Sequence, residues 1–144
     1  MTLRIFRRLR DEQGSAPVEL LIMTPVIVMM VGLALFTGRV GTIKQDVISA
    51  SRDSARAASA RQFAGPAAAD GEAAATQTLA ARNVSCQTLT VSVDTSNLAP
   101  GGSVTSTVTC VVDLSDVTNL LGLPGTVSIE ATSTAIVDRF RGGS

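Results

Sequence analysis

The sequence predicts an α+β protein in which a long N-terminal membrane-spanning helix carries a short second helix and a small three-stranded antiparallel sheet. Two observations predict this fold class. An apolar run flanked by arginines fills the first third of the chain, and alternating apolar and hydroxyl residues fill the last third. The chain has 144 residues, of which only 3% are aromatic, so it has the length of one domain and a thin aliphatic core. We expect the sheet to pack on the outer half of the long helix.

The membrane-spanning segment is predicted at residues 15–38. Nineteen residues, LLIMTPVIVMMVGLALFTG, separate Glu19 from Arg39 without a charge, and a bilayer core takes about 20 apolar residues in a helix. The leader, residues 1–14, is basic through Arg4, Arg7, Arg8 and Arg10. Short arginine-rich flanks stay in the cytoplasm. We therefore expect a single pass through the cytoplasmic membrane, with the C-terminal domain outside.

Two other interpretations of the apolar run are less favoured. A cleaved secretory signal has a shorter apolar region and a small-residue exit, whereas this run ends in Leu35-Phe36-Thr37-Gly38. A buried helix of a soluble domain needs a cover, and no other segment is large enough to provide it. The run therefore favours a retained membrane span.

Glu19 lies at the edge of the apolar run. A carboxylate at the centre of a bilayer costs about 2.5–3.5 kcal/mol, and less near the edge. Glu19 can therefore lie among the lipid headgroups, or it can cap the first turn of a helix that Pro17 starts.

The helix is expected to continue outside the membrane over residues 39–64, from Pro17 to about Ala60 in all, with a kink at Pro25. A stripe at spacings of three and four marks one helical face; it consists of Val40, Ile43, Val47, Ala50, Ser54 and Ala58. We expect this stripe to pack on the protein's own outer domain, and a neighbouring helix is the alternative.

The charged residues of this helix are expected to form a solvated face. They are Arg52, Asp53, Arg56 and Arg61. Acidic residues interrupt the group, and no aromatic side chain accompanies it for base stacking. Twelve basic and twelve acidic residues balance overall, so we expect no nucleic-acid partner.

The outer domain is predicted at residues 65–144. Gly65-Pro66 should break the long helix, and residues 67–82 should form a second helix starting near Asp70. Three alternating runs follow, separated by a turn at residues 99–102 and a loop at residues 120–125. The runs are Leu89 to Val93, Val104 to Leu114, and Val127 to Val137. Their apolar face should cover the helix, and their Thr and Ser face should meet water.

Cys86 and Cys110 are the only cysteines, and an oxidising compartment would favour a disulfide between them. They are nearly equidistant from the turn near residue 98, so they can face each other across two strands. Cys110 shares a strand face with Val108 and Val112. Cys86, three positions before Leu89, would lie on the opposite face of its strand from Leu89. A bulge, or a position of Cys86 just before the strand, would resolve the mismatch.

Residues 7–30 combine a basic leader, Gly14-Ser15, Glu19 and the apolar run with Pro25. This order resembles the prepilin leader of type IV pilin-like proteins. The stretch DEQGSAPVELLIMTPVIV looks most like the TadE-like family of minor pilins or pseudopilins from tight-adherence pilus systems. The motif covers about 25 residues, and Ser15 stands where pilins often have Phe.

The resemblance implies that a membrane-bound prepilin peptidase cuts between Gly14 and Ser15 and leaves the apolar run in the mature protein. Glu19 is then the fifth residue, and its carboxylate could pair with the new Ser15 ammonium of a neighbouring subunit. The implied partners are the membrane, the peptidase, other pilin or pseudopilin subunits and the pilus assembly machinery. The implied function is structural, in a pilus or secretion-type assembly, with a location outside the cell where the subunit enters a pilus.

Two further functions stay open. The chain could be an uncleaved single-pass anchor for an extracellular binding module, in which Glu19 has no role. A secreted enzyme is less favoured, because the chain has no His, the usual proton shuttle and metal ligand. Two cysteines alone cannot complete a four-ligand zinc site. We expect no catalytic residue, cofactor, metal or small-molecule substrate.

Overall fold

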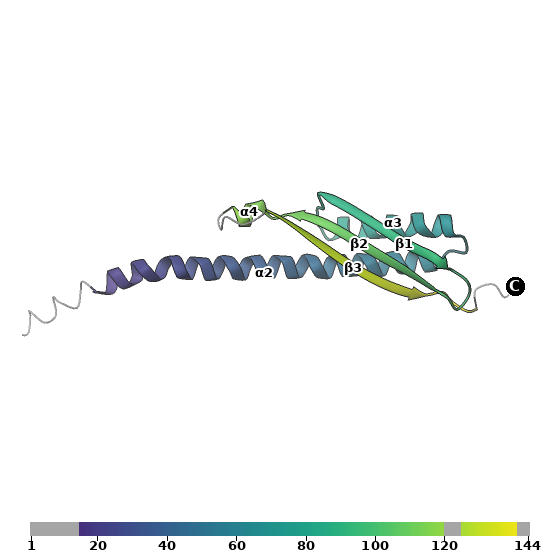
Figure 1. Ribbon diagram of the computed structural model, residues 1–144, viewed down its shortest axis with the longest axis horizontal. Coiled ribbons are helices and arrows are strands. Elements are labelled where there is room, and N and C mark those ends of the chain that lie inside the picture. Colours follow the sequence, from purple (N-terminus) through teal and green to yellow (C-terminus); the bar gives the residue numbers. More distant parts are fainter. Residues whose placement is uncertain (1–14, 120–124, 141–144) are drawn as a thin grey trace, which may run out of the picture. The chain divides into compact units, whose positions relative to one another are not determined.

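A computed structural model of the chain describes residues 15–119 and 125–140, and it confirms the α+β class (Figure 1). The chain divides into two compact units, an N-terminal unit, Met1–Gly38, and a C-terminal unit, Arg39–Ser144. The elements are α2 (Ser15–Ser59), α3 (Ala64–Ala81), β1 (Thr88–Asn97), β2 (Ser103–Asp113), α4 (Ser115–Thr118) and β3 (Thr126–Ile136).

Helix α2 is continuous through Pro25 and ends at Ser59. This end agrees with the expected end near Ala60, but the predicted continuation over residues 39–64 is too long. After Ser59 the backbone tightens, because the Arg61 N–H donates to the Ala58 carbonyl at 3.1 Å. Phe63 is then extended, with φ −117° and ψ 139°. The helical ladder therefore stops before Gly65.

Helix α3 begins at Ala64 rather than near Asp70. The prediction that Gly65-Pro66 separates the two helices was therefore wrong. Both residues lie in the first turn of α3. The N–H groups of a first turn have no partner within the helix, so proline loses nothing there and its fixed φ suits the helix. The break between the helices falls instead at residues 60–63.

The three predicted strands form one antiparallel sheet in the order β1-β2-β3. Val91 pairs with Val108, and Val108 pairs with Ala131, so apolar residues share one face across all strands. The opposite face carries hydroxyls, including the pairs Thr105–Thr134 and Thr107–Thr132, each at 3.0 Å. The expected turn at residues 99–102 is confirmed, since the Gly102 N–H donates to the Ala99 carbonyl at 2.8 Å.

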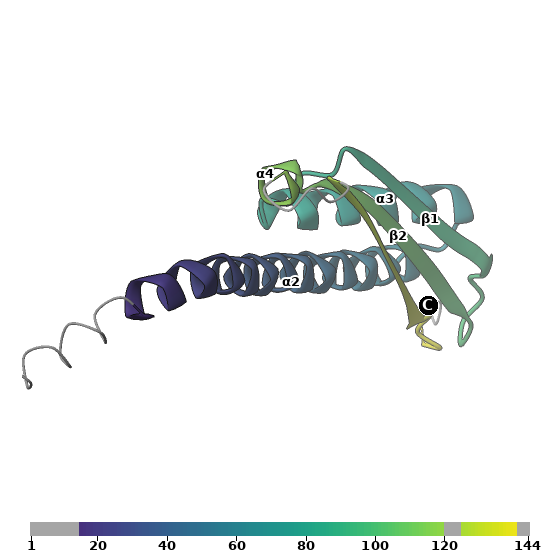
Figure 2. The same ribbon diagram turned by 60° about the vertical axis from the view of Figure 1, so that its left-hand side comes forward.

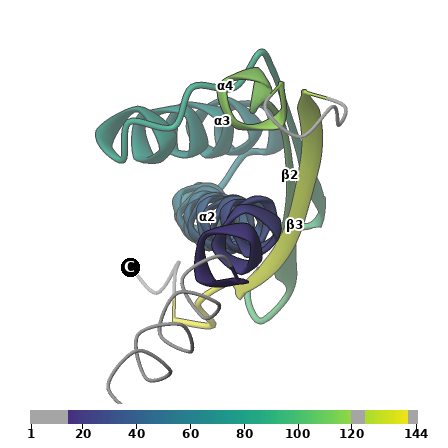
Figure 3. The ribbon, with the colours of Figure 1, turned by 90° about the vertical axis from the view of Figure 1, so that its left-hand side faces the viewer.

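The apolar face of the sheet is covered by α3 and by the part of α2 that follows residue 38 (Figure 3). The strands cross these two helices obliquely (Figure 2). In the predicted stripe of α2, Val47, Ala50, Ser54 and Ala58 are all 0% exposed. Val40 and Ile43, nearer its start, are half-buried. The stripe therefore packs on the protein's own C-terminal unit, as expected.

Buried hydroxyls bridge α2 to the sheet. Ser106 Oγ donates to Ser54 Oγ at 2.7 Å, and Ser51 Oγ shares a hydrogen bond of 2.7 Å with Ser133 Oγ. Because a buried hydroxyl without a partner costs roughly 1–3 kcal/mol, these two pairs hold strand and helix in register. The interface is narrow because small residues line both sides of it.

The short helix α4 was not predicted. It follows β2 directly, and the Thr118 hydroxyl, which is buried, donates to the Leu114 carbonyl at 3.1 Å. The loop expected at residues 120–125 lies outside the described residues, apart from Gly125. Four residues give no readable periodicity, so α4 could not be found from the sequence.

Gly71→Val should destabilise the C-terminal unit. A Cβ atom at Gly71 would lie 3.0 Å from Val93 Cγ2 and 3.2 Å from the Ser54 carbonyl oxygen. It would therefore wedge α3 away from both α2 and β1. Overpacking of this kind costs about 1–3 kcal/mol, which should lower the Tm followed by circular dichroism. Gly65→Ala is the matched control, because its Cβ meets nothing within 4 Å. An unchanged Tm for Gly71→Val would contradict this packing.

Candidate functional site

The predicted cleavage site is only partly within the described residues. Gly14 and the rest of the leader lie outside them. Ser15 is the first residue of α2, and Pro17 falls in its first turn.

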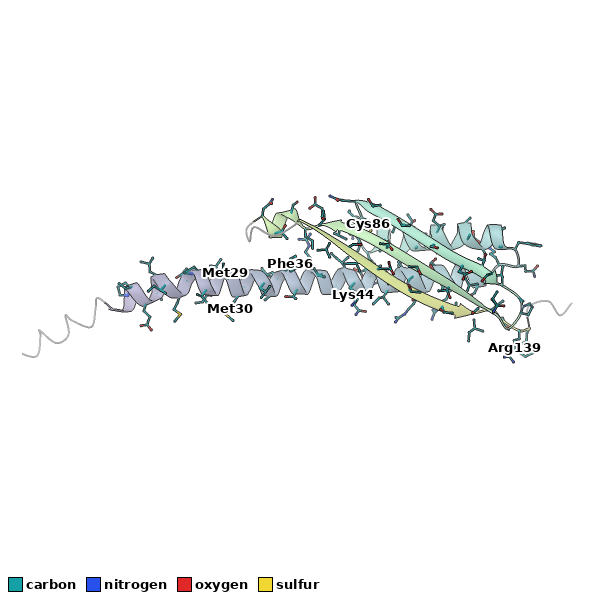
Figure 4. The ribbon with its side chains drawn as sticks, viewed as in Figure 1. Met29, Met30, Phe36, Lys44, Cys86 and Arg139 are labelled. Atoms are coloured by element: carbon teal, nitrogen blue, oxygen red, sulfur yellow. A yellow bond between two sulfur atoms is a disulfide. The ribbon has the colours of Figure 1, made fainter. Side chains whose placement is uncertain are left out.

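The N-terminal unit presents an apolar helix with nothing packed on it. Within the described residues, one helix is long and apolar enough to cross a membrane. None of its apolar stretch is buried. Met29 and Met30 are 67% and 68% exposed and project to different sides of α2 (Figure 4). The described chain therefore does not bury this helix, in agreement with the lower weight that the sequence analysis gave to a buried helix. This surface fits a single-pass membrane anchor.

The hydroxyl groups within the apolar run are satisfied by the helix itself. Thr24 Oγ1 donates to the Leu20 carbonyl at 2.6 Å, and Thr37 Oγ1 donates to the Leu33 carbonyl. In lipid there is no water to satisfy such groups, so these internal bonds are required. Both threonines are therefore compatible with a bilayer without any partner.

Glu19 is different. It is exposed, and no hydrogen bond or ion pair joins its carboxylate group to another described residue. It lies two residues after Pro17 on α2. The alternative that it caps a first turn started by Pro17 stays a prediction. Between Ser15 and Arg39, Glu19 is the one residue with an acidic or basic side chain.

The predicted charged face of α2 is confirmed as solvated. Arg52, Asp53 and Arg56 are exposed. The polar residues along this side hold α3 in place, since Arg61 pairs with Asp70 and the Thr78 hydroxyl donates to Asp53 at 2.9 Å. These contacts lie at the surface, where each contributes little to stability.

The structure contains the Cys86–Cys110 disulfide, with a Cα–Cα distance of 5.4 Å. Cys86 lies just before β1, which begins at Thr88, and this resolves the parity mismatch in one of the two expected ways. The bond fixes the segment after α3 to the central strand. The two cysteines are separated by 24 positions in the sequence. A disulfide that closes a loop of this length stabilises the folded state by roughly 3 kcal/mol in the chain-entropy model.

A cleft of about 380 Å³ lies at the start of the C-terminal unit. Residues 39–46 of α2, the segment 82–85 and the end of β2 line it. Arg82 Nη1 and Asp46 Oδ1 form an ion pair of 2.9 Å across it, with the Arg82 side chain 47% exposed. Sequence reasoning missed this cleft, because its walls come from three segments far apart in the chain.

Asp113 at the edge of the cleft is held in its ionised form. The backbone N–H of Ser115 donates to Asp113 Oδ1 at 2.8 Å and lowers the pKa of this carboxyl below its usual value of 3.8. Gln87 Nε2 donates to the other oxygen at 3.0 Å. In the same way, the Ser96 backbone N–H lowers the pKa of Asp94. Each carboxylate accepts the backbone N–H of the residue two positions later, Asp113 at the end of β2 and Asp94 at the register shift within β1.

No family model, curated protein or solved structure matches this chain. Among residues 15–119 and 125–140, no group of three or more His, Cys, Asp or Glu side chains is arranged to hold a metal ion. The candidate site therefore rests on the exposed apolar helix, the unpaired Glu19 and the cleft.

The C-terminal unit should lose stability as the pH falls below about 4. The pKa of Asp113 and that of Asp94 are lower in the folded chain than the ordinary 3.8. Each ionised carboxylate therefore stabilises the fold above that value, and its contribution disappears as the pH falls through the folded pKa. Asp113→Asn should flatten this acid limb in Tm measurements between about pH 2 and 6.

Glu72→Gln is the control for this prediction, because it removes an exposed carboxylate from α3 rather than from a turn. If the Tm of Asp113→Asn fell with decreasing pH as steeply as that of the wild type, the carboxylate of Asp113 would not contribute to the loss of stability in acid.

Proposed function

We propose that this protein is a TadE-like minor pilin or pseudopilin, a structural subunit of a tight-adherence pilus or secretion-type assembly. A prepilin peptidase would process it after Gly14. Other pilin or pseudopilin subunits and the assembly machinery would be its partners, and it would have no catalytic residues of its own. The proposal includes an orientation with the N-terminus in the cytoplasm and the C-terminal unit outside the cytoplasmic membrane.

One observation carries this proposal: a single helix has two surfaces of opposite kind. Up to Leu35 its large apolar side chains are exposed by half or more. From Val47 to Ala58 its inward face is buried under the sheet. The first part therefore needs a cover that the described chain does not supply. A membrane covers it before assembly, and the helices of neighbouring subunits can cover it afterwards.

Glu19 supports the same proposal through its lack of a partner. Cleavage after Gly14 creates an ammonium group at Ser15, and residues four apart lie on the same side of a helix. Each subunit would then present one positive and one negative group, one turn apart. A neighbour displaced along the helix axis can pair its ammonium with this carboxylate and offset the cost of desolvating both. Such a pair would set the register between subunits.

The first experiment determines the N-terminus of the protein in native membranes by mass spectrometry. We expect the mature chain to begin at Ser15. Gly14→Leu should retain the leader, whereas Gly41→Leu, at a helical glycine with open space around it, should be cut as in the wild type. An intact leader in the wild-type chain would favour the uncleaved anchor of a binding module instead.

The second experiment tests the carboxylate. Glu19→Ala should be inserted and processed normally but should enter assemblies several-fold less, measured by crosslinking between subunits in membranes. The physical reason is that the Ser15 ammonium loses its partner in an apolar place. Glu72→Ala, which removes an exposed carboxylate from α3, is the control and should assemble normally. Wild-type assembly of Glu19→Ala would remove the basis for the pairing.

A further inference from the structure

The cleft at the start of the C-terminal unit gathers charged and polar side chains from three segments of the chain. Its volume is about 380 Å³. Three segments meet there, and the Cys86–Cys110 bond lies next to the segment 82–85 and fixes it. The cleft is therefore a formed feature of the fold rather than a gap beside a loose loop.

The cleft carries both signs of charge. Arg39 and Arg82 contribute two guanidinium groups, and Asp46 and Asp113 contribute two carboxylates. Asp46 Oδ1 lies 2.9 Å from Arg82 Nη1, in an ion pair. The guanidinium group of Arg39, by contrast, has no ion pair or hydrogen bond with any described residue. Asp113 is exposed and ionised at neutral pH. The cleft thus offers one unpaired cation and one accessible anion, with no net charge over the four groups.

The position of the cleft along the chain indicates the source of its ligand. Arg39 directly follows the last residue of the apolar run and also lines the cleft. Residues 39–46 of α2, which form one wall of the cleft, therefore follow the predicted membrane-spanning run directly in the chain. The small molecules at the edge of a bilayer are lipid headgroups, which combine phosphate with a second polar group.

We propose that this cleft binds the zwitterionic phosphoethanolamine headgroup of a membrane lipid. Arg39 receives the phosphate with its free donors, and Arg82 adds a second guanidinium while it stays paired with Asp46. Asp113 accepts the ammonium group. A neutral zwitterion matches the neutral lining, whereas phosphatidylglycerol carries the same phosphate but has no ammonium group for Asp113. The inference rests on the apolar run crossing a membrane, and it holds whether or not the leader is cleaved.

The test uses the full chain, taken in mild detergent from vesicles that contain equal amounts of phosphatidylethanolamine, phosphatidylglycerol and phosphatidylcholine. Native mass spectrometry then identifies the lipid that stays bound. We expect phosphatidylethanolamine on the wild type. Arg39→Gln should retain about tenfold less of it, because one hydrogen-bonded charge contributes on that order to affinity. Arg56→Gln, on the exposed face of the same helix, should retain it fully.

Two further variants separate the cleft from simple attraction of lipid to an arginine. Ser85→Phe leaves every charge in place but fills the cleft, and it should lose the lipid. Asp113→Asn keeps a side chain that can cap the turn and should shift the preference from phosphatidylethanolamine to phosphatidylglycerol. Circular dichroism and the mass of the disulfide-bonded chain check that each variant is folded.

Several results would overturn the proposal. Equal lipid retention by wild type, Arg39→Gln and Ser85→Phe would show that the bound lipid is only the annular layer. A preference of the wild type for phosphatidylglycerol would exclude the zwitterion. Displacement of the lipid by soluble phosphoethanolamine at equal affinity would assign the cleft to the free compound. None of these results depends on whether Ser15 is the mature N-terminus, so the pilin proposal is tested separately.

Discussion

The C-terminal unit depends on the close approach of α2 to the sheet. The two aromatic residues in this unit, Phe63 and Phe140, are 73% and 91% exposed, so neither fills the core. Val47, Ala50 and Ala58 fill the interface with little volume, and the backbones must come close to leave no voids. Close approach brings Ser51 and Ser54 into hydrogen-bonding distance of the sheet. Helix α3 packs closely as well, since a Cβ atom at Gly71 would lie 3.0 Å from Val93 Cγ2 and 3.2 Å from the Ser54 carbonyl oxygen.

The same helix meets two environments, and its polar groups follow from this. Where α2 is apolar and exposed, Thr24 and Thr37 turn their hydroxyls back onto the helix carbonyls. Where α2 is buried, Ser51 and Ser54 use theirs to bind strands. Glu19 follows neither rule, because it lies on the apolar part and is joined to no other described residue. The pairing between subunits proposed above would give this carboxylate a partner.

The sequence could predict a large part of the fold because periodicity acts locally. Spacings of three and four along α2 and the alternation along β1, β2 and β3 report which face of each element is apolar. The start of α3 at Ala64 was less well predicted. Gly65-Pro66 breaks a helix interior but fits a first turn, and only the neighbouring backbone decides which of these applies.

By itself, the sequence determined the apolar run, the arginines before it, the place of Glu19 and the class of fold, since each of these depends on residues near one another in the chain. Tertiary structure alone decided that Asp46 meets Arg82 and that Ser54 meets Ser106. It also decided that Arg39 and Asp113 line one cleft. These contacts join residues far apart in the chain, so no local sequence pattern predicts them. They depend on the packing of helix and sheet, because small side chains let the two approach closely.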